Sequence, residues 1–204
     1  MDDFDRGRDG RSTDLASGGG VPHWIAASLN FCSRCGSTLQ FGLVDGEDRE
    51  RLACPDCGHI VYVNPRLVVT VFPITEAGEI VLIRRGIEPR MGWWAQPGGF
   101  LEVDETVNQA AIRETWEETG LLVEPGEMIG LYTRLEAAVV TLAFEARIVG
   151  GTAAPTPEAT EVRAFAPEDI PWPGIAFATT TWALRDWLER HRPDLDWPEE
   201  NAGR

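Results

Sequence analysis

The hydrophobic and polar positions of the chain alternate in blocks that predict a mixed sheet, with one helix in its middle and one at its end. Runs of β-branched and apolar residues predict strands at 67–75, 79–85, 128–134, 137–149 and 161–166. Apolar anchors at helical spacing predict a closing helix at 177–191. Strands interleaved with helices in this way are typical of an α/β/α sandwich.

The stretch that the other elements surround is 98–121, which reads GGFLEVDETVNQAAIRETWEETGL. It starts with a glycine turn and then becomes helical. Asp104 is the expected N-cap, and acids in the first turn suit the positive end of the helix dipole. Gly120 stands where a left-handed C-cap residue ends a helix.

The predicted helix gathers acidic side chains on one side. Glu114, Glu117 and Glu118 fall within an arc of about 100° on a regular helix. Carboxylates at this spacing repel one another unless a cation lies between them. A solvated acidic face is the plain alternative to a functional site.

The neighbours of the glutamates favour the functional interpretation, because the helix is expected to be covered on two sides. The glutamate side also carries Val107, Ala110 and Ala111. The opposite side carries Ile112, Trp116 and Thr119 as a second buried face. Free solvation is expected only for Thr106, Gln109 and Arg113. Inward-facing glutamates predict oxygen ligands for a hard cation such as Mg²⁺.

Composition limits the classes of protein to which the chain can belong. Its 204 residues, 43% of them hydrophobic, suffice for one domain with a core and a small module. The net charge of −15 disfavours electrostatic binding of nucleic acid. All 18 Lys or Arg residues are arginine, which excludes Schiff-base lysine chemistry and a Walker A lysine. With no apolar run that spans a membrane and no leader pattern, a cytoplasmic protein without a membrane partner is expected.

Composition also predicts how the chain is divided. Residues 1–28 are rich in Asp, Arg, Gly and Ser and are expected to form a disordered tail, with a partner-binding arm as the alternative. A small cysteine module is expected at 29–63, and the main domain at 64–191. The proline-rich acidic end, 192–204, is expected to be a second tail.

The cysteine module contains the only four cysteines, in two Cys-x2-Cys pairs with glycine after each second cysteine: Cys32, Cys35, Cys54 and Cys57. This spacing is typical of a four-cysteine zinc ribbon. Four thiolates close the coordination tetrahedron, so the predicted Zn²⁺ is structural rather than catalytic. Disulfides and a redox Cys-x-x-Cys motif are the alternatives. A short turn at 46–48 is expected to join two small strands of this module.

The central stretch also resembles a known signature, the Nudix box, written G-x5-E-x7-R-E-U-x-E-E-x-G-U with U a bulky aliphatic residue. The matching positions are Gly99, Glu105, Arg113, Glu114, Glu117, Glu118, Gly120 and Leu121. One position departs from the pattern, because Thr115 stands where an aliphatic residue is usual. The motif is long and its context of strand, turn and helix fits, so the match is specific.

This resemblance implies hydrolysis of the pyrophosphate bond in a nucleoside diphosphate linked to another moiety, with Mg²⁺ or Mn²⁺ as cofactor. It implies that Glu114 and Glu118 are the core metal ligands. Glu117 is implied as a third or water-mediated ligand, and the main-chain carbonyl of Gly99 as a further one. Glu117 and Glu118 are thereby the implied catalytic glutamates. Glu105 and Arg113 match the structural ion pair of the family.

The catalytic base is less directly indicated. Family members use either a box glutamate or one from a later loop. Glu158 and Glu161 lie in a suitable loop region before a predicted strand, and Glu161 is favoured. The alternative is that both are ordinary loop acids.

Residues that flank the box supply candidate substrate contacts. Trp93, Trp94 and Phe100 have rings that stack on nucleobases in other sites, although tryptophans in such strands are more often core residues. Arg84, Arg85 and Arg90 precede the box and have guanidinium groups suited to phosphates, with surface arginines as the alternative. Among these residues, the predicted substrate contacts are Arg84, Arg90, Trp94 and Phe100.

The resemblance extends over about residues 30–190 to a group with the same ribbon, the plant chloroplast FAD pyrophosphatases and related bacterial ADP-ribose pyrophosphatases. It implies that FAD or ADP-ribose is cleaved with release of AMP. NADH pyrophosphatases also carry a ribbon, but their SQPWPFPxS element is reduced here to a fragment within 170–177. A silent ligand sensor and an RNA-end hydrolase are further alternatives. A homodimer through the ribbon is possible in this group.

Overall fold

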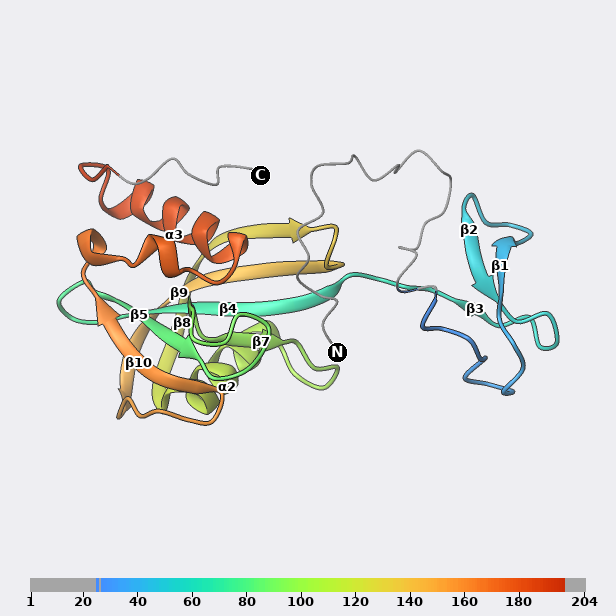
Figure 1. The fold of residues 1–204 in the computed structure, drawn as a ribbon, viewed down its shortest axis with the longest axis horizontal. Helices are drawn as coiled ribbons and strands as arrows, with labels where there is room; N and C mark the ends of the chain where they lie inside the picture. Colours follow the sequence, from blue (N-terminus) through green and yellow to red (C-terminus); the bar gives the residue numbers. More distant parts are fainter. Residues whose placement is uncertain (1–24, 26, 197–204) are drawn as a thin grey trace. The chain divides into compact units, whose positions relative to one another are not determined.

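The computed structural model describes residue 25 and residues 27–196 (Figure 1). The chain divides into two compact units, Met1–Asn64 and Pro65–Arg204, which are described separately below. Most of the tail predicted at 1–28, and the last part of the tail predicted at 192–204, lie outside the described residues.

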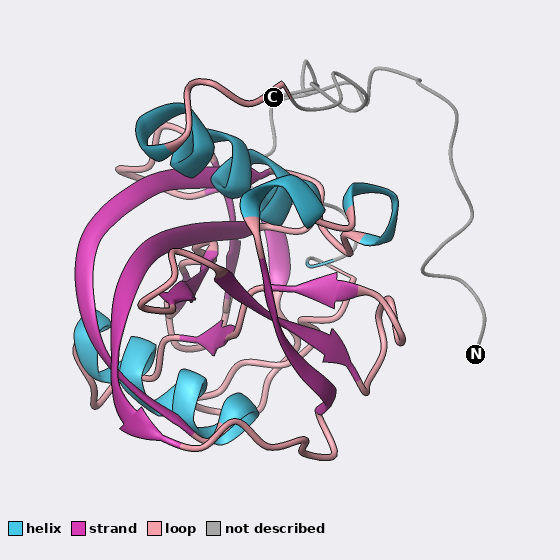
Figure 2. Ribbon diagram, turned by 90° about the vertical axis from the view of Figure 1, so that its left-hand side faces the viewer, coloured by secondary structure: helices cyan, strands magenta, loops and turns pink. Residues whose placement is uncertain are grey.

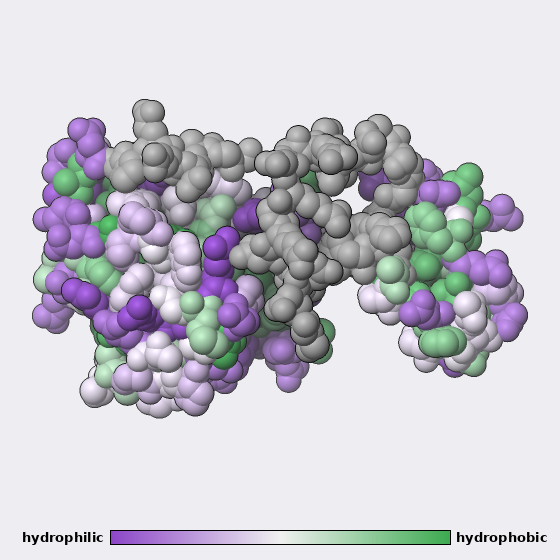
Figure 3. All heavy atoms as spheres, in the orientation of Figure 1, coloured by the Kyte–Doolittle hydropathy of each residue, from purple (hydrophilic) through white to green (hydrophobic). Residues whose placement is uncertain are grey.

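The first unit is a small ribbon around the cysteines. Its antiparallel sheet has the order β1-β2-β3, formed by Gln40–Leu43, Glu50–Ala53 and Ile60–Val61. The buried cluster of this unit consists of two cysteines and two leucines: Cys32, Leu39, Leu52 and Cys54. So little apolar burial leaves the fold of the unit dependent on a bound metal. Several of its apolar side chains are exposed, namely Phe31, Phe41 and Leu43. Figure 3 shows hydrophobic surface on this unit.

The second unit is built on a seven-stranded mixed sheet whose main path is β10-β5-β4-β9-β8. The strands are β4 (Arg66–Ile74), β5 (Ile80–Arg85), β6 (Trp94–Ala95), β7 (Gly98–Phe100), β8 (Leu121–Arg134), β9 (Val139–Gly151) and β10 (Ala159–Phe165). β4 and β9 are parallel, and the other pairs are antiparallel. Short β6 pairs with β5 and short β7 pairs with β4, which places the Gly-Gly turn beside the middle of the sheet.

Two helices cover the sheet from opposite sides, α2 (Val107–Thr119) and α3 (Ala178–His191) (Figure 2). Each helix packs on its own apolar cluster. The larger cluster includes Phe72, Leu82, Trp182 and Leu184 and lies under α3. The smaller one contains Val69, Val71, Ala110, Ala111, Val123 and Ala146 and lies under α2. The sandwich predicted from the sequence is therefore confirmed. Two short 3₁₀ helices, η1 (Pro167–Asp169) and η2 (Trp172–Gly174), precede α3.

The strand boundaries agree with the sequence pattern except at β8. The prediction begins this strand at residue 128, whereas β8 begins at Leu121, directly after the helix cap. Pro125 and Gly126 interrupt the apolar pattern, and the pairing of β8 with β9 is irregular between Pro125 and Met128. A bulge lets an edge strand continue through such an interruption. From the sequence alone, the first part of β8 therefore looked like a loop.

The helix α2 starts later than predicted. Its N-cap is Thr106, not Asp104, and no acidic residue lies in its first turn. The Thr106 side chain accepts from the Gln109 N–H at 3.3 Å, and the Gln109 side chain accepts from the Thr106 N–H at 2.8 Å. This reciprocal capping box satisfies two free donors. Gly120 ends the helix with φ of 72°, as predicted.

The second buried face predicted for α2 is wrong. Ile112 and Trp116 are exposed, whereas Thr119 is buried as expected. Thr115, the position that departs from the motif, is also fully buried, and its hydroxyl donates to the Ala111 carbonyl at 2.7 Å. A buried threonine therefore fills the aliphatic position because its own helix satisfies its hydroxyl. Arg113 is not freely solvated either, since it makes several ion pairs described below.

Membrane insertion finds no support among the described helices. None of the helices at residues 25–196, residue 26 aside, is long and apolar enough to cross a bilayer.

Candidate functional site

The Gly-Gly turn and the glutamates of α2 meet at very short range. The Gly98 N–H donates to Glu118 Oε2 at 2.8 Å. A Cβ atom placed on Gly99 would lie 2.5 Å from Glu114 Oε1, so this carboxylate rests directly against the Gly99 backbone. A Cβ atom on Gly98 would lie 2.3 Å from the Val69 carbonyl oxygen of β4. Glycine is required at Gly98, where the backbone of β4 blocks a side chain, whereas a side chain at Gly99 would displace the Glu114 carboxylate.

The electrostatics of this contact favour a cation. Burial raises the pKa of Glu118 to about 8, against the opposing effect of the Gly98 N–H, and the charge of Glu114 raises the pKa further. Burial likewise raises the pKa of Glu114, although Arg113 opposes this effect. A buried and a half-buried carboxylate, both with raised pKa values, lie beside a bare backbone and form an oxygen-rich site that fits a hard divalent cation.

Arg113 holds the rim of the site together. Its guanidinium donates to both carboxylate oxygens of Glu105, at 2.6 and 2.9 Å, and to the Phe100 carbonyl at 3.2 Å. It also donates to Glu114 at 2.7 Å and to Glu117 at 3.1 Å. These bonds lower the pKa of Glu105 to about 2. The bidentate pair therefore ties the loop before α2 to the helix itself.

The three box glutamates do not form one tight cluster. Glu117 is exposed and accepts from Arg113 Nη1 at 3.1 Å, the same nitrogen that donates to Glu114. Among the described residues, only the cysteines bring three or more metal-binding side chains close together. Glu114 and Glu118 are thus the pair that the fold places at the Gly-Gly turn, and Glu117 stands at its edge.

The two candidate bases occupy different positions. A bulge in β10 between Ala159 and Glu161 sets Glu161 opposite Arg84, and their side chains lie 3.6 Å apart. The charge of Glu158, in contrast, acts directly on Glu118 and raises its pKa. Glu161 thus pairs with Arg84, whereas the charge of Glu158 acts on Glu118, and the bulge that separates them left no signal in the sequence.

Of the three arginines before the box, Arg85 is the one on which the charge of Glu118 acts. The charges of Glu118, Glu88 and Glu158 act on its guanidinium, although burial, the larger effect, lowers its pKa. The Arg84 side chain donates to the Gly92 carbonyl at 2.9 Å, and the guanidinium of Arg90 lies 5.0 Å from the centre of the Trp93 ring. The sequence prediction named Arg84 and Arg90. Neighbouring side chains of a strand point to opposite faces, so the different contacts of Arg84 and Arg85 depend on strand register, which the sequence does not give.

The three aromatic candidates lie in different environments. Trp94 packs edge-on against Phe165 at 4.8 Å and belongs to the rim of the core under α3, which fits the structural alternative. Phe100 and Trp93 are exposed, each with an arginine over its ring, Arg66 in the case of Phe100. These two rings are the ones accessible to a ligand.

Gln96 is a candidate that the sequence interpretation missed. It stands two residues before Gly98 and is 5% exposed, and its Oε1 atom has no hydrogen-bond partner among the described residues. A buried acceptor without a partner costs free energy, and a bound donor would recover it. Its only signal in the sequence is that a polar residue stands between the apolar Ala95 and Pro97, just before the Gly-Gly turn.

The four cysteines are arranged for one metal ion. Their sulfur atoms lie within 4.8 Å of one another, with Cys32 and Cys57 at 3.7 Å and Cys35 and Cys54 at 3.4 Å. Four thiolates about 2.3 Å from a central Zn²⁺ have sulfurs about 3.8 Å apart. None of the four is in a disulfide. The arrangement fits a tetrahedral zinc site.

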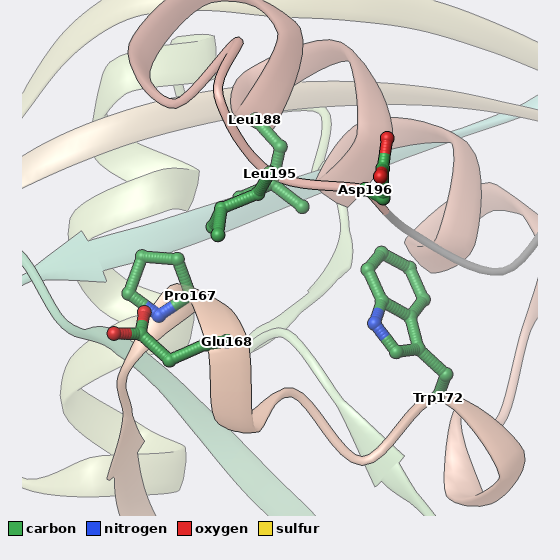
Figure 4. Close-up of a pocket in the computed structure, with 6 residues that line it drawn as sticks. All are labelled: Pro167, Glu168, Trp172, Leu188, Leu195 and Asp196. Carbon is green, nitrogen blue, oxygen red and sulfur yellow. The ribbon is translucent and has the colours of Figure 1, made fainter.

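The best-formed pockets lie away from these residues. One of about 100 Å³ is shown in Figure 4, lined by Pro167, Glu168, Trp172, Leu188, Leu195 and Asp196. A second of about 370 Å³ lies alongside and shares Pro167 and Glu168. Neither is lined by a residue of the box. The candidate site is therefore identified by the chemistry of its side chains and not by the shape of a cavity.

Comparisons with known proteins agree with this geometry. The NUDIX domain family matches residues 64–190, and a family described as Nudix N-terminal matches residues 30–63. An ADP-ribose pyrophosphatase of Methanocaldococcus jannaschii is 32% identical over 54% of this chain and 68% of its own length. A NAD-capped RNA hydrolase NudC of Pseudomonas aeruginosa is 33% identical over 81% of this chain and 54% of its own length. The chain thus spans about half the length of that relative.

A solved structure shows the same fold. The crystal structure of a NUDIX hydrolase from Nitrosomonas europaea superimposes with a TM-score of 0.74 and 34% sequence identity. The match covers 80% of this chain and 93% of that one. The likeness therefore extends beyond the motif to most of the chain.

Removing one cysteine tests the zinc site. We expect Cys32→Ser to lose bound zinc and to unfold the ribbon, because the buried apolar cluster there is too small to hold it. Zinc content by atomic absorption and the protection of ribbon amides in hydrogen exchange would measure both. Full zinc content with unchanged protection would contradict a structural four-cysteine site.

Two neighbouring glycines test the contact at the turn. We expect Gly99→Ala to fold but to bind Mn²⁺ at least about tenfold more weakly, because the new methyl group displaces only the flexible Glu114 side chain. Gly98→Ala is expected to lose stability instead, because its methyl group meets the rigid backbone of β4. Calorimetric metal titration and melting temperatures separate the two outcomes. Wild-type metal affinity in Gly99→Ala would contradict the assigned contact.

Proposed function

Because the chain belongs to the Nudix family, we propose that it is a divalent-metal-dependent hydrolase of nucleoside diphosphates linked to a second moiety, releasing AMP. The observation that carries this proposal is the meeting of Glu114 and Glu118 with the Gly98–Gly99 backbone. Here two carboxylates of one helix, the buried Glu118 and the half-buried Glu114, lie against backbone that carries no side chains. Such a site suits the neutralisation of phosphate charge.

We propose that Glu114, Glu118 and the Gly99 carbonyl hold Mg²⁺ or Mn²⁺, with Glu117 joining at the exposed edge. When bound, the metal lowers the pKa of water and neutralises the charge that develops on the phosphates. Arg113 keeps Glu114 in place through its bond at 2.7 Å. Glu105 in turn fixes Arg113, so this pair positions a ligand and does not touch substrate.

The protein also supplies a proton acceptor and a phosphate-binding cation. We propose Glu158 as the base that takes the proton of the attacking water, with Glu161 as the second choice. Glu158 is exposed to solvent and acts electrostatically on Glu118, whereas Glu161 already pairs with Arg84. Arg85 lies within the influence of both Glu118 and Glu158 and is suited to a phosphate oxygen.

For the substrate, we propose FAD or ADP-ribose. Support comes from the resemblance to FAD and ADP-ribose pyrophosphatases, and from a relative named ADP-ribose pyrophosphatase. Relatives named NAD-capped RNA hydrolase favour NADH or NAD-capped RNA as a second candidate. The net charge of −15 weighs against a long RNA partner. Four cysteines that form no disulfide and bind zinc fit a reducing, cytoplasmic compartment. We also propose that the protein forms a homodimer.

One chromatographic assay tests the proposed function. Purified protein with Mg²⁺ or Mn²⁺ is given FAD, ADP-ribose, NADH or NAD-capped RNA separately, and release of AMP, or of nicotinamide mononucleotide from the capped RNA, is compared. We expect FAD or ADP-ribose to be cleaved well ahead of the others. Preferential decapping of RNA would move the assignment to the second candidate.

Glu118→Gln is the matched control for this assay. We expect it to lose at least about a hundredfold in kcat, because it removes a metal charge without changing volume. Its fold is expected to persist, since the amide oxygen still accepts the Gly98 N–H. Circular dichroism and melting temperature confirm folding. Activity above a tenth of wild type would contradict the role of Glu118.

A further inference from the structure

A short loop beside the acidic residues exposes three apolar side chains. Residues 86–93 connect β5 with β6. Within them, Ile87 is 42% exposed, Met91 56% and Trp93 37%. Apolar side chains that gather at the surface next to a polar site are typical of ligand contact surfaces. The box and its metal-binding residues make no use of them.

Hydrogen bonds hold the backbone of this loop in place. The Arg84 side chain donates to the Gly92 carbonyl at 2.9 Å, and the Arg85 side chain donates to the Pro89 carbonyl at 2.8 Å. Within the loop, the Trp93 N–H donates to the Arg90 carbonyl at 3.1 Å. The exposed side chains therefore project from a fixed backbone, and a ligand pays little ordering entropy to use them.

The same loop is joined to the candidate active site. The Gly86 N–H donates to the Glu158 carbonyl at 2.7 Å, and a Cβ atom on Gly86 would lie 2.2 Å from the Pro157 carbonyl oxygen. Arg85 links the two regions, because its side chain binds the loop while the charges of Glu118 and Glu158 act on it. At the other end, the Arg85 N–H donates to the Trp93 carbonyl at 2.9 Å. A substrate phosphate at Arg85 thus brings its next group to the loop.

We propose that the loop binds a planar ring attached beyond the diphosphate, through Met91 and Trp93, and so selects FAD over ADP-ribose. This inference rests on the proposed function. The Arg90 guanidinium lies over the indole, 5.0 Å from its centre, and Trp93 is still 37% exposed, so the ring keeps surface for a second flat group. A flavin or nicotinamide ring stacks on such a surface, and a thioether packs well against ring edges. Ribose 5-phosphate offers no equivalent apolar area.

The test compares substrates that share the AMP half and differ beyond it. The double variant Met91→Ala/Trp93→Ala is assayed for kcat/KM with FAD, NADH and ADP-ribose under one metal condition. We expect values for FAD and NADH to fall about tenfold or more, as for removal of a stacking aromatic residue. The value for ADP-ribose is expected to fall by less than about twofold, because its terminal group does not stack.

Two matched variants control the test. Met128→Ala removes an equally exposed methionine, 48% exposed, from the edge strand β8 at the far side of the sheet, and is expected to change no ratio between substrates. Trp93→Phe keeps an aromatic face and is expected to restore most of the preference for FAD. Failure of phenylalanine to restore it would overturn stacking as the basis of selection.

The remaining outcomes are decisive as well. Equal losses for all three substrates would place the loop on the shared AMP half and overturn the proposal, as would no loss at all. If the wild type cleaves none of them, calorimetric binding of FAD and ADP-ribose to wild type and to the double variant replaces kinetics. A preference for FAD that disappears in the variant would then support the loop while the proposed hydrolysis fails. Equal affinities in both proteins would overturn the loop.

Discussion

The site depends on how closely strand β7 approaches the elements on either side of it. A Cβ atom at Gly98 would lie 2.3 Å from the backbone of β4, and one at Gly99 would lie 2.5 Å from the Glu114 carboxylate of α2. The sheet and the helix meet here only because two side chains are missing. Glu118 then becomes buried and finds a backbone donor in Gly98. The acidic residues owe their position to this contact.

Charge balance explains why the arrangement is tolerated and what it is suited for. Arg113 compensates the outer acids, Glu105 and Glu117, and part of Glu114. The inner carboxylate, Glu118, forms no ion pair with an arginine of the described residues and is left with a backbone N–H and the field of Arg85. Burial raises its pKa to about 8, and the Gly98 N–H and the Arg85 charge offset that effect only in part. A divalent cation would supply the missing positive charge. The burial of Glu118 costs stability without a cation and therefore favours the binding of one.

The parts that could be predicted from the sequence are those set by local chemistry. Gly120 ends the helix because its conformation suits glycine, and two cysteine pairs define a metal module by spacing alone. The errors arise where long-range contacts decide. Trp116 has an apolar side chain at helical spacing, yet no other element covers it. Asp104 and Thr106 are both good caps, and the partner Gln109, three residues after Thr106, was the signal that distinguishes them.

The difference between local chemistry and long-range contacts also applies to function: the first indicates the reaction, and the second determines the substrate. The box is one continuous stretch, so its motif is readable and implies a reaction class. The residues around the rest of a substrate come from separate strands, and their roles follow from register. A bulge in β10 directs Glu161 towards Arg84 and leaves Glu158 near Glu118. Neighbouring Arg84 and Arg85 serve different regions for the same reason. Since an acidic chain must bind an anionic substrate locally, such register-dependent contacts decide which nucleotide fits.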